Sequence, residues 1–368
     1  MKYRIIASAI CISVTLGGCG SFAGRHGIDS GYAYIDSHEY AKALASFESA
    51  EENGEDACLI HRGKGIAYLY CDENEQAAQE LLASLAEDDG IVDDMDFDTN
   101  YYLAEAYMRL DDFNRAKGIY DAILSLRDKD PTAYYLRGVC ELKAGGDEDK
   151  KSADADFTNA IRLNSKDYSM IVMIYKAYAE NGDEEKAKTI LQHALESDEK
   201  TMSNFEKGEM YFYLGNDAEA QNYLSKANKE SGGHDTKESV VLLLGQSYER
   251  QQQYDYAISV YKEYLKNNSK SANISNQLGM CQVSKGRFYL DSGNEDEAAN
   301  AFGEAIISFD GGIQLNDNAV QQALMFNKIC AYEYSGDFES AKKLMSDYMT
   351  MYPLDKAAKD EMTFLETR

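Results

Sequence analysis

Cys19 is the first residue whose type and setting suggest covalent chemistry. It follows Gly17 and Gly18 at the end of an apolar run, in the stretch SVTLGGCGSF (13–22). A cysteine thiolate is a nucleophile. Cys19 therefore has three possible roles: half of a disulfide, a buried packing thiol, or the point at which the chain is attached to something else.

The segment before Cys19 favours attachment. Lys2 and Arg4 precede IIASAICISVTL (5–16), which has the length of a signal-peptide core and is too short to span a bilayer. Residues 16–19, LGGC, resemble the lipobox of bacterial lipoproteins. The resemblance implies cleavage after residue 18, acylation of Cys19 and anchoring on the extracytoplasmic face of a cell membrane or outer membrane. An ordinary secretory signal, or an N-terminal helix with a buried thiol, is the alternative.

The remaining cysteines show no metal or disulfide pattern. Cys11 lies within the signal segment, and the number of the others is odd and their spacings irregular, which predicts small core residues: Cys58, Cys71, Cys140, Cys281 and Cys330. Cys58 and His61 could share one face of a helix, but two further zinc ligands are not evident. We expect no metal site here.

An acidic stretch offers a weak calcium pattern. In DDMDFDTNYYLAE (93–105), Asp94, Asp96, Asp98 and Glu105 take positions 1, 3, 5 and 12 of a calcium loop. The sixth position is Thr99 rather than Gly, and Glu105 falls inside an expected helix. The favoured interpretation is an acidic insertion in which Asp98 or Thr99 caps the following helix.

The sequence shows no motif of an enzyme. A phosphate-binding glycine loop after a strand, G-x-S-x-G and H-E-x-x-H are all missing from it. Paired carboxylates are too common in this chain to single out one pair. We predict a non-catalytic protein that needs no cofactor.

The composition and the net charge restrict the fold class and the kinds of partner. Two prolines, no tryptophan and abundant Ala, Leu, Glu and Lys predict an all-α protein. The net charge is −27, and loss of residues 1–18 with Lys2 and Arg4 would make it −29. A surface this acidic repels nucleic acid and anionic lipid. Attachment to a membrane therefore requires an anchor.

A pattern of small and aromatic residues repeats along the chain. GYAYIDSHEYAKALASFESA (31–50) and GEMYFYLGNDAEAQNYLSKA (208–227) share a glycine, a tyrosine three residues later, an alanine nine after that and a large apolar residue four further on. The alanine recurs as Ala43, Ala77, Ala116, Ala153, Ala187, Ala220, Ala257, Ala298 and Ala341, and the tyrosine is replaced in one copy by Glu141. The pattern resembles the tetratricopeptide repeat, a 34-residue helix-turn-helix.

This resemblance implies an all-α, right-handed superhelical solenoid of about nine repeats with a C-terminal capping helix. We expect a signal peptide at 1–18, the lipidated cysteine and a tether at 19–27, repeats at 28–353 and the cap at 354–368. Glycine and alanine would sit where paired helices nearly touch, and the large apolar residue would fill the gap to the next repeat. Extra residues would lengthen the turn of the fourth repeat, and a long helix would begin near Asn273.

Family geometry places binding residues on the concave face, on the first helix of each repeat. The groove residues implied are Tyr70, Tyr101, Arg109, Tyr135, Met202, Phe205, Glu209, Phe212, Tyr213 and Arg250. A surface of this kind suits a protein or peptide segment with an apolar anchor beside a Lys or Arg, approaching Glu209. The carboxylate clamp of chaperone-binding members is not matched. The alternative for each aromatic residue is packing between repeats.

The function predicted is therefore an exported lipoprotein that acts as a protein-binding scaffold or assembly adaptor at the cell envelope. One alternative is a lipid-anchored receptor for a solute or oligosaccharide, with tyrosines stacking on the ligand. A calcium-controlled binding module is the other.

Overall fold

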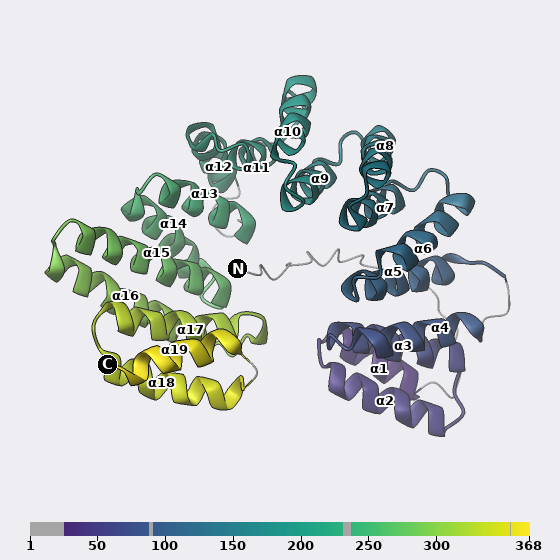
Figure 1. Cartoon of the computed structure of the whole chain (residues 1–368), viewed down its shortest axis with the longest axis horizontal. Helices are drawn as coiled ribbons and strands as arrows, with labels where there is room; N and C mark the ends of the chain where they lie inside the picture. The colour runs from purple at the N-terminus through teal and green to yellow at the C-terminus, as the bar shows by residue number, and fades with distance from the viewer. Residues whose placement is uncertain (1–25, 88–90, 231–236, 354) are drawn as a thin grey trace. The chain divides into compact units, whose positions relative to one another are not determined.

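The computed structural model describes residues 26–87, 91–230, 237–353 and 355–368. Within these ranges it is entirely helical, which confirms the predicted all-α class (Figure 1). The helices are α1 (His26–Asp36), α2 (Tyr40–Glu52), α3 (Ala57–Tyr70), α4 (Asn74–Ala86), α5 (Asp94–Arg109), α6 (Phe113–Leu126), α7 (Pro131–Ala144), α8 (Asp147–Leu163), α9 (Tyr168–Glu180), α10 (Glu184–Asp198), α11 (Asn204–Tyr213), α12 (Asp217–Glu230), α13 (Glu238–Arg250), α14 (Tyr254–Asn267), α15 (Ala272–Asp291), α16 (Glu295–Ile313), α17 (Asn318–Tyr334), α18 (Phe338–Met351) and α19 (Lys356–Glu366).

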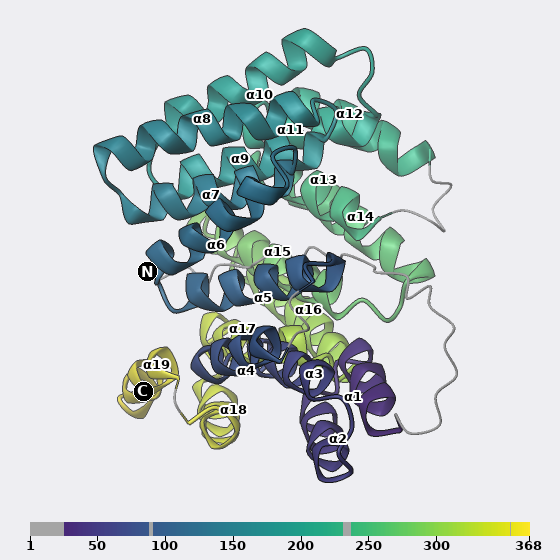
Figure 2. The ribbon, with the colours of Figure 1, turned by 90° about the vertical axis from the view of Figure 1, so that its right-hand side faces the viewer.

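The chain forms two compact units, Met1–Asn164 and Ser165–Arg368. The first holds α1–α8, and the second holds α9–α19. Within each unit consecutive helices pair as antiparallel hairpins that pack against the next hairpin, as α7 and α8 illustrate side by side in both views (Figures 1 and 2). The signal peptide and Cys19 lie outside the described residues. No described helix has the length and apolarity needed to cross a membrane.

The repeated alanines and the apolar residues that follow them form the core of every hairpin. Each alanine of the series Ala43 to Ala341 is fully buried, as are Phe47, Leu81, Tyr120, Phe157, Leu191, Leu224, Tyr261, Phe302 and Met345. The structure refines the predicted role of the glycine. A Cβ on Gly31 would meet the Phe47 ring at 2.5 Å, so the glycine makes room for that ring rather than for the facing backbone.

Phe47 also contacts the next repeat. A Cβ on Gly63 of α3 would lie 2.1 Å from Cζ of the same ring. One buried ring therefore joins α1, α2 and α3 and links the first repeat to the second.

Each hairpin turn contains a residue in the left-handed conformation. These residues are His38, Asp72, Asp111, Gly145, Gly182, Gly215, Gln252, Gly293 and Gly336. In the turns that follow a repeat tyrosine, the next backbone N–H donates to the carbonyl of that tyrosine, as in Asp337 to Tyr332 at 3.0 Å. In the fourth repeat the N–H of Gly145 itself donates to the Glu141 carbonyl at 3.2 Å. This bond satisfies a carbonyl that the end of the first helix would leave free.

Two predicted length changes have different outcomes. α15 begins at Ala272 and runs for 20 residues, so the long helix expected near Asn273 is confirmed. The extra residues of the fourth repeat do not lengthen its turn. They extend α8, which starts directly after Gly145 and Gly146 because Gly145 takes the left-handed conformation that ends α7.

The first described helix, α1, is capped by a side chain that lies far from it in the sequence. The backbone N–H groups of Gly27 and Ile28 donate to the carboxylate of Glu55 at 3.0 and 3.1 Å. Glu55 follows α2, so the hairpin itself supplies the partner for the free donors that begin α1.

The fourth repeat buries an ionic cluster at the position of its missing tyrosine. Arg137 donates to Asp156 at 2.6 and 2.7 Å and to Asp121 at 2.7 Å. Glu141 is 3% exposed, with Lys117 Nζ 3.6 Å from Oε1, and Oε2 has no hydrogen-bond partner among the described residues. Burial, reinforced by the charge of Asp156, raises the pKa of Glu141 to about 7.

Glu141→Gln is therefore expected to stabilise the first unit above neutral pH. The folded state keeps a proton that the unfolded state releases from about pH 4.5 upward, so stability falls as pH rises from 4.5 to 7. Replacing the Glu141 carboxyl by an amide should raise the free energy of unfolding by about 2 kcal/mol at pH 8 and make that free energy less dependent on pH. Denaturant unfolding of both proteins at pH 5 and pH 8 measures the effect. A variant less stable at pH 8 would show that Lys117 keeps Glu141 ionised at little cost.

Candidate protein-binding face

The first helices of successive repeats contact one another and form a row in each unit. In the first unit α1 contacts α3 and α3 contacts α5. In the second unit the row runs through α9, α11, α13, α15 and α17. We call these the first-helix rows. Every predicted groove residue except Met202 belongs to a first helix.

In the first unit, the predicted residues divide between packing and surface. Tyr101 donates to Asp130 at 2.8 Å and packs on the Tyr120 ring, and Tyr135 packs on Phe157. Both rings thus lie against the second helix of their own repeat. Tyr70 is 41% exposed and stacks on Tyr40 with centroids 5.1 Å apart. Of these tyrosines, Tyr70 has the most exposed ring.

In the second unit, the predicted groove residues near α11 are only partly exposed to a binding partner. Met202 lies before the helix and is buried, so its thioether does not belong to an open surface. Phe205 and Glu209 are half-buried on α11. Phe212 and Tyr213 end the same helix with their rings edge to face, 5.4 Å apart.

Phe212 is also covered by the neighbouring repeat. The guanidinium of Arg250 lies 3.8 Å from the Phe212 ring centroid, and Nη2 donates to the Phe212 carbonyl at 2.9 Å. Arg109 makes the equivalent bond to the carbonyl of Leu69, at 2.9 Å. Both arginines stand at the same repeat position and cap the first helix of the preceding repeat. Each arginine thus links the first helices of two neighbouring repeats, a role that the sequence analysis did not predict.

A tyrosine makes a similar link at the other side of α11. Tyr175 of α9 donates to the Tyr213 carbonyl at 3.0 Å, and its ring packs on Tyr213. The C-terminal end of α11 is therefore held by α9 and by α13. Its aromatic residues pack between repeats while keeping part of their surface exposed.

Half-buried carboxyl groups lie along the row of the second unit. Burial raises the pKa of Glu209, an effect that Lys176 of α9 reduces. Burial also raises the pKa of Glu249 on α13, although this group accepts hydrogen bonds from Tyr261 at 2.7 Å and Gln277 at 3.2 Å. The row therefore presents partly desolvated acidic groups that a cationic guest would stabilise.

Exposed apolar residues of this row lie on α15. Met280 and Leu290 are 41% and 40% exposed. They occupy the same repeat positions, two and twelve, as Met202 and Phe212 do in the sixth repeat. Extending that register to the eighth repeat would have found them in the sequence.

The acidic stretch of α5 does not form a calcium loop. Asp93 is the N-cap of α5 and forms a capping box with Asp96, so the expected cap at Asp98 or Thr99 is wrong. Asp94 pairs with Arg127, and Asp98 pairs with Arg62. Helix formation separates the carboxylates that a loop would bring together.

The other metal candidate also has local partners. His61 Nδ1 lies 2.6 Å from a Glu80 oxygen, and the Cys58 thiol lies 3.5 Å from the Ser84 hydroxyl. Across the described part of the chain, no group of three or more His, Cys, Asp or Glu side chains is arranged to hold a metal.

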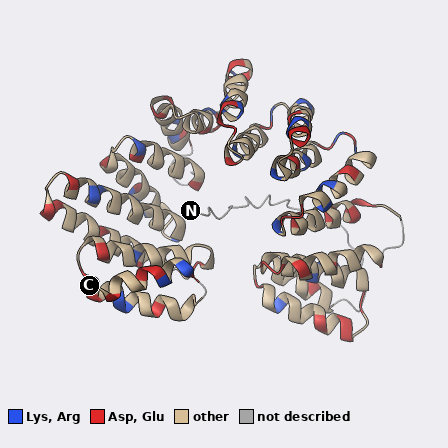
Figure 3. Ribbon diagram, viewed as in Figure 1, with Lys and Arg blue, Asp and Glu red and all other residues tan. Residues whose placement is uncertain are grey.

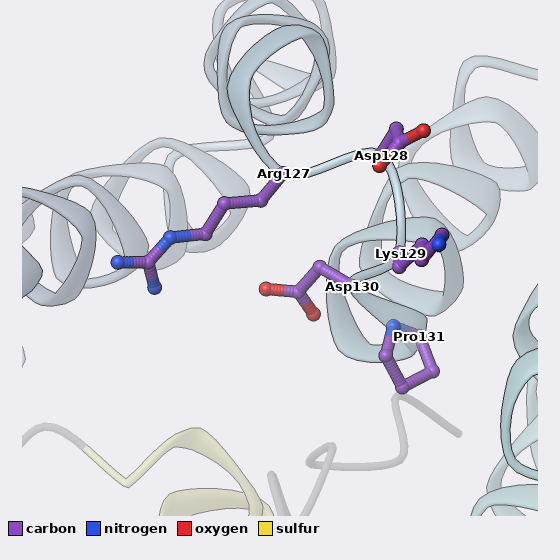
Figure 4. Close-up of a pocket in the computed structure, with 5 residues that line it drawn as sticks. All are labelled: Arg127, Asp128, Lys129, Asp130 and Pro131. Atoms are coloured by element: carbon purple, nitrogen blue, oxygen red, sulfur yellow. The ribbon is translucent and has the colours of Figure 1, made fainter.

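A pocket at the α6–α7 turn is lined by side chains that already have structural roles. Figure 4 shows its lining residues, which are Arg127, Asp128, Lys129, Asp130 and Pro131. The Arg127 guanidinium lies 3.4 Å from the Phe97 ring centroid. Asp130 accepts from the backbone of Thr132 and Ala133 as the cap of α7. These roles leave the first-helix rows as the stronger candidate site.

Basic side chains are scattered among acidic ones in each unit (Figure 3). Several are held over tyrosine rings, such as Lys42 over Tyr34, Arg115 over Tyr107 and Lys186 over Tyr178. In each of these pairs the cation lies eight residues after the tyrosine near the end of the first helix. The described residues therefore carry no broad basic surface of the kind that binds nucleic acid.

Solved structures with similar architecture have low sequence identity to the chain. YrrB, described as a TPR protein with an unusual peptide-binding site, is 20% identical, covering 47% of this chain and 86% of its own, with a TM-score of 0.38. A tetratricopeptide repeat protein from Parabacteroides merdae is 15% identical, covering 74% and 99%, with a TM-score of 0.42. The human IFIT1 dimer with PPP-AAAA is 15% identical, covering 91% and 69%, with a TM-score of 0.43. None of the curated proteins matches the sequence.

Family models identify the repeats directly. Models described as tetratricopeptide repeat match residues 101–150, 173–201 and 239–271. The last segment lies on the α13–α14 hairpin, and the second lies on α9 and α10. The matches fall in both units and coincide with the hairpins whose alanines are fully buried. The chain thus contains tetratricopeptide repeats in both units.

Proposed function

We propose that the chain is an exported, lipid-anchored scaffold that binds a protein or peptide segment on its first-helix rows and has no catalytic activity. Tetratricopeptide repeats support the protein-binding part of this proposal. The row of the second unit supports the location, because it combines exposed apolar side chains with half-buried acidic ones.

The partner expected is a segment with an apolar anchor and a nearby Lys or Arg. Met280 and Leu290 offer exposed apolar surface on α15, and Glu209 offers a desolvated carboxylate on α11. Thioethers adapt to differently shaped guests, which suits Met280 to an anchor contact. The net charge of −27 would speed the approach of a basic segment at low salt.

Selection of a peptide library on the full chain in detergent tests this chemistry. Enriched peptides should pair an aromatic or aliphatic residue with a Lys or Arg, and Met280→Asp should weaken their binding by roughly 30-fold, as loss of a central anchor does. Ile307→Asp is the matched control, because Ile307 is 72% exposed on a second helix, α16. An equal loss of peptide binding in both variants would contradict binding on the first-helix row. Stabilisation by oligosaccharides and by no peptide would favour the receptor alternative.

Cys19→Ser tests the anchor. The thiol is both the acyl acceptor and the residue at which a lipoprotein signal is cut, so the variant should remain an uncleaved and unacylated precursor. Mass spectrometry of the intact chain and metabolic labelling with a fatty-acid analogue measure both properties. Cleavage before residue 19 in the variant would instead indicate an ordinary secretory signal.

A further inference from the structure

The arginines on the described first helices form ion pairs with carboxylates, with one exception. These pairs join Arg62 to Asp98, Arg109 to Glu105, Arg137 to Asp121 and Asp156, and Arg250 to Asp217. Arg287 of α15 is exposed and forms no ion pair with a described carboxylate. Acidic residues outnumber Lys and Arg by 64 to 37 in this chain, so an unpaired arginine on a first helix requires an explanation.

The guanidinium of Arg287 is positioned by an aromatic ring of the next repeat. Its Cζ lies over the Tyr334 ring of α17, 5.2 Å from the ring centroid, and Tyr334 is 42% exposed. A cation–π contact of this kind uses the face of the ring and consumes none of the five N–H donors. Among the described residues, none accepts a hydrogen bond from these donors. The pair therefore presents a positioned fork of donors to solvent, and such a fork matches a carboxylate.

Met280 lies on the same face of α15 as Arg287. The two residues are seven positions apart, which is nearly two helical turns and about 10.5 Å along the helix axis. Met280 is the exposed apolar residue proposed above to contact the anchor of a bound segment. An extended segment advances about 3.3 Å per residue. Residues of that segment that contact Met280 and Arg287 are therefore about three positions apart.

A neighbouring carboxylate restricts the direction from which an acid can approach Arg287. Asp291 is exposed on α15, one turn after Arg287, and the two side chains form no ion pair. Its negative charge would repel a carboxylate on that side, so the acid should approach from the side of Met280. The first-helix row continues from α15 to α17, so the bound segment need not end at Arg287. The side chain of an internal Asp or Glu thus fits the site better than a terminal carboxylate.

We propose that Arg287 and Tyr334 form an acid-selective subsite, which binds an Asp or Glu about three residues from the apolar anchor at Met280. This inference rests on the proposed function, because it assigns a second charged group to the same bound segment. The segment then carries a Lys or Arg for Glu209 and an acid for Arg287. Acids elsewhere in the segment are repelled by the net charge of −27, so the position of this one acid determines specificity.

Peptides selected from an amidated library on the full chain in detergent are the probes for this subsite. Enriched peptides should carry Asp or Glu about three residues from an aromatic or aliphatic anchor. The natural chain should bind each of them roughly 5- to 10-fold more tightly than a counterpart with Asn or Gln in place of the acid, as expected for a charge-assisted contact open to solvent. Moving the acid next to the anchor should abolish this preference.

Arg287→Gln should reduce the preference for the acid to less than about twofold and leave the affinity for the Asn or Gln counterpart almost unchanged. Arg287→Glu should reverse the preference in favour of a peptide with Lys at that position. Arg162→Gln is the matched control, because Arg162 is also exposed and forms no ion pair with a described carboxylate, but lies on a second helix, α8. This variant should bind like the natural chain.

The possible results distinguish this subsite from the proposed function. If the natural chain enriches no peptide, both the proposed function and the subsite are contradicted. If it enriches peptides that carry no acid, or if Arg287→Gln keeps the full preference for the acid, only the subsite is overturned. An equal loss of preference in Arg287→Gln and Arg162→Gln would likewise overturn the subsite and leave peptide binding in place.

Discussion

Gly63→Ala is expected to destabilise the first unit by about 2 kcal/mol, within the range of overpacking in a filled core. The added Cβ would lie 2.1 Å from Cζ of Phe47, and that ring is fully buried between α1, α2 and α3. On the α1 side the ring already lies against Gly31, where a Cβ would be 2.5 Å from it, so it cannot move far in that direction. Hydrogen exchange should show the loss of protection concentrated in these three helices, because stability in a repeat array comes mainly from contacts between neighbours.

Gly118→Ala is the matched control for this substitution. Gly118 also lies inside a helix of the first unit, but a Cβ there would meet nothing within 4 Å. Alanine should therefore stabilise α6 by roughly 0.5 to 1 kcal/mol through its better helix propensity. Opposite signs for the two variants are the expected result. A uniform loss of protection over the whole chain in Gly63→Ala would contradict nearest-neighbour stacking.

Arg137→Met is expected to destabilise the first unit by about 3 kcal/mol, because it leaves the buried carboxylate of Asp156 without its partner. The Asp156 side chain is 5% exposed, and Arg137 supplies two of its hydrogen bonds. Denaturant unfolding at pH 7 measures the loss. Adding Asp156→Asn to Arg137→Met should restore a large part of it, since the unpaired charge is then removed.

The same cluster offers a second control. Asp121 also accepts from Arg137, but its side chain is 51% exposed. Asp121→Asn should therefore change stability by less than about 1 kcal/mol, as expected for an ion pair open to solvent. Losses of stability of similar size for Arg137→Met and Asp121→Asn would show that solvent, and not Arg137, stabilises the negative charge of Asp156.

Much of the fold could be predicted from the sequence because its anchors act through size. Ala220 and Ala257 are fully buried because only a methyl group fits between the paired helices, and spacing alone locates such residues. The turns could have been predicted as well, since a glycine four residues after the tyrosine recurs at Gly182, Gly215 and Gly336. Asp111 and Gln252 take the same conformation without glycine, so residue type alone does not reveal it.

The candidate site was harder to predict because it depends on contacts between repeats. Arg109 and Arg250 have the residue type of binding groups, yet both donate to carbonyls of the preceding repeat. Those bonds join residues 38 and 40 positions apart, and helix periodicity does not identify them.

Site-specific photo-crosslinking tests the binding face most directly. A benzophenone side chain is placed at Met280 on the first-helix row or at Ile307 on the second helix α16, and the full chain is irradiated in the cells that produce it. The proposal predicts that Met280 crosslinks to a defined polypeptide whose contact peptide contains an apolar residue near a Lys or Arg, and that Ile307 does not. Crosslinking of the same polypeptide from both positions, or from Ile307 alone, would contradict binding on the first-helix row.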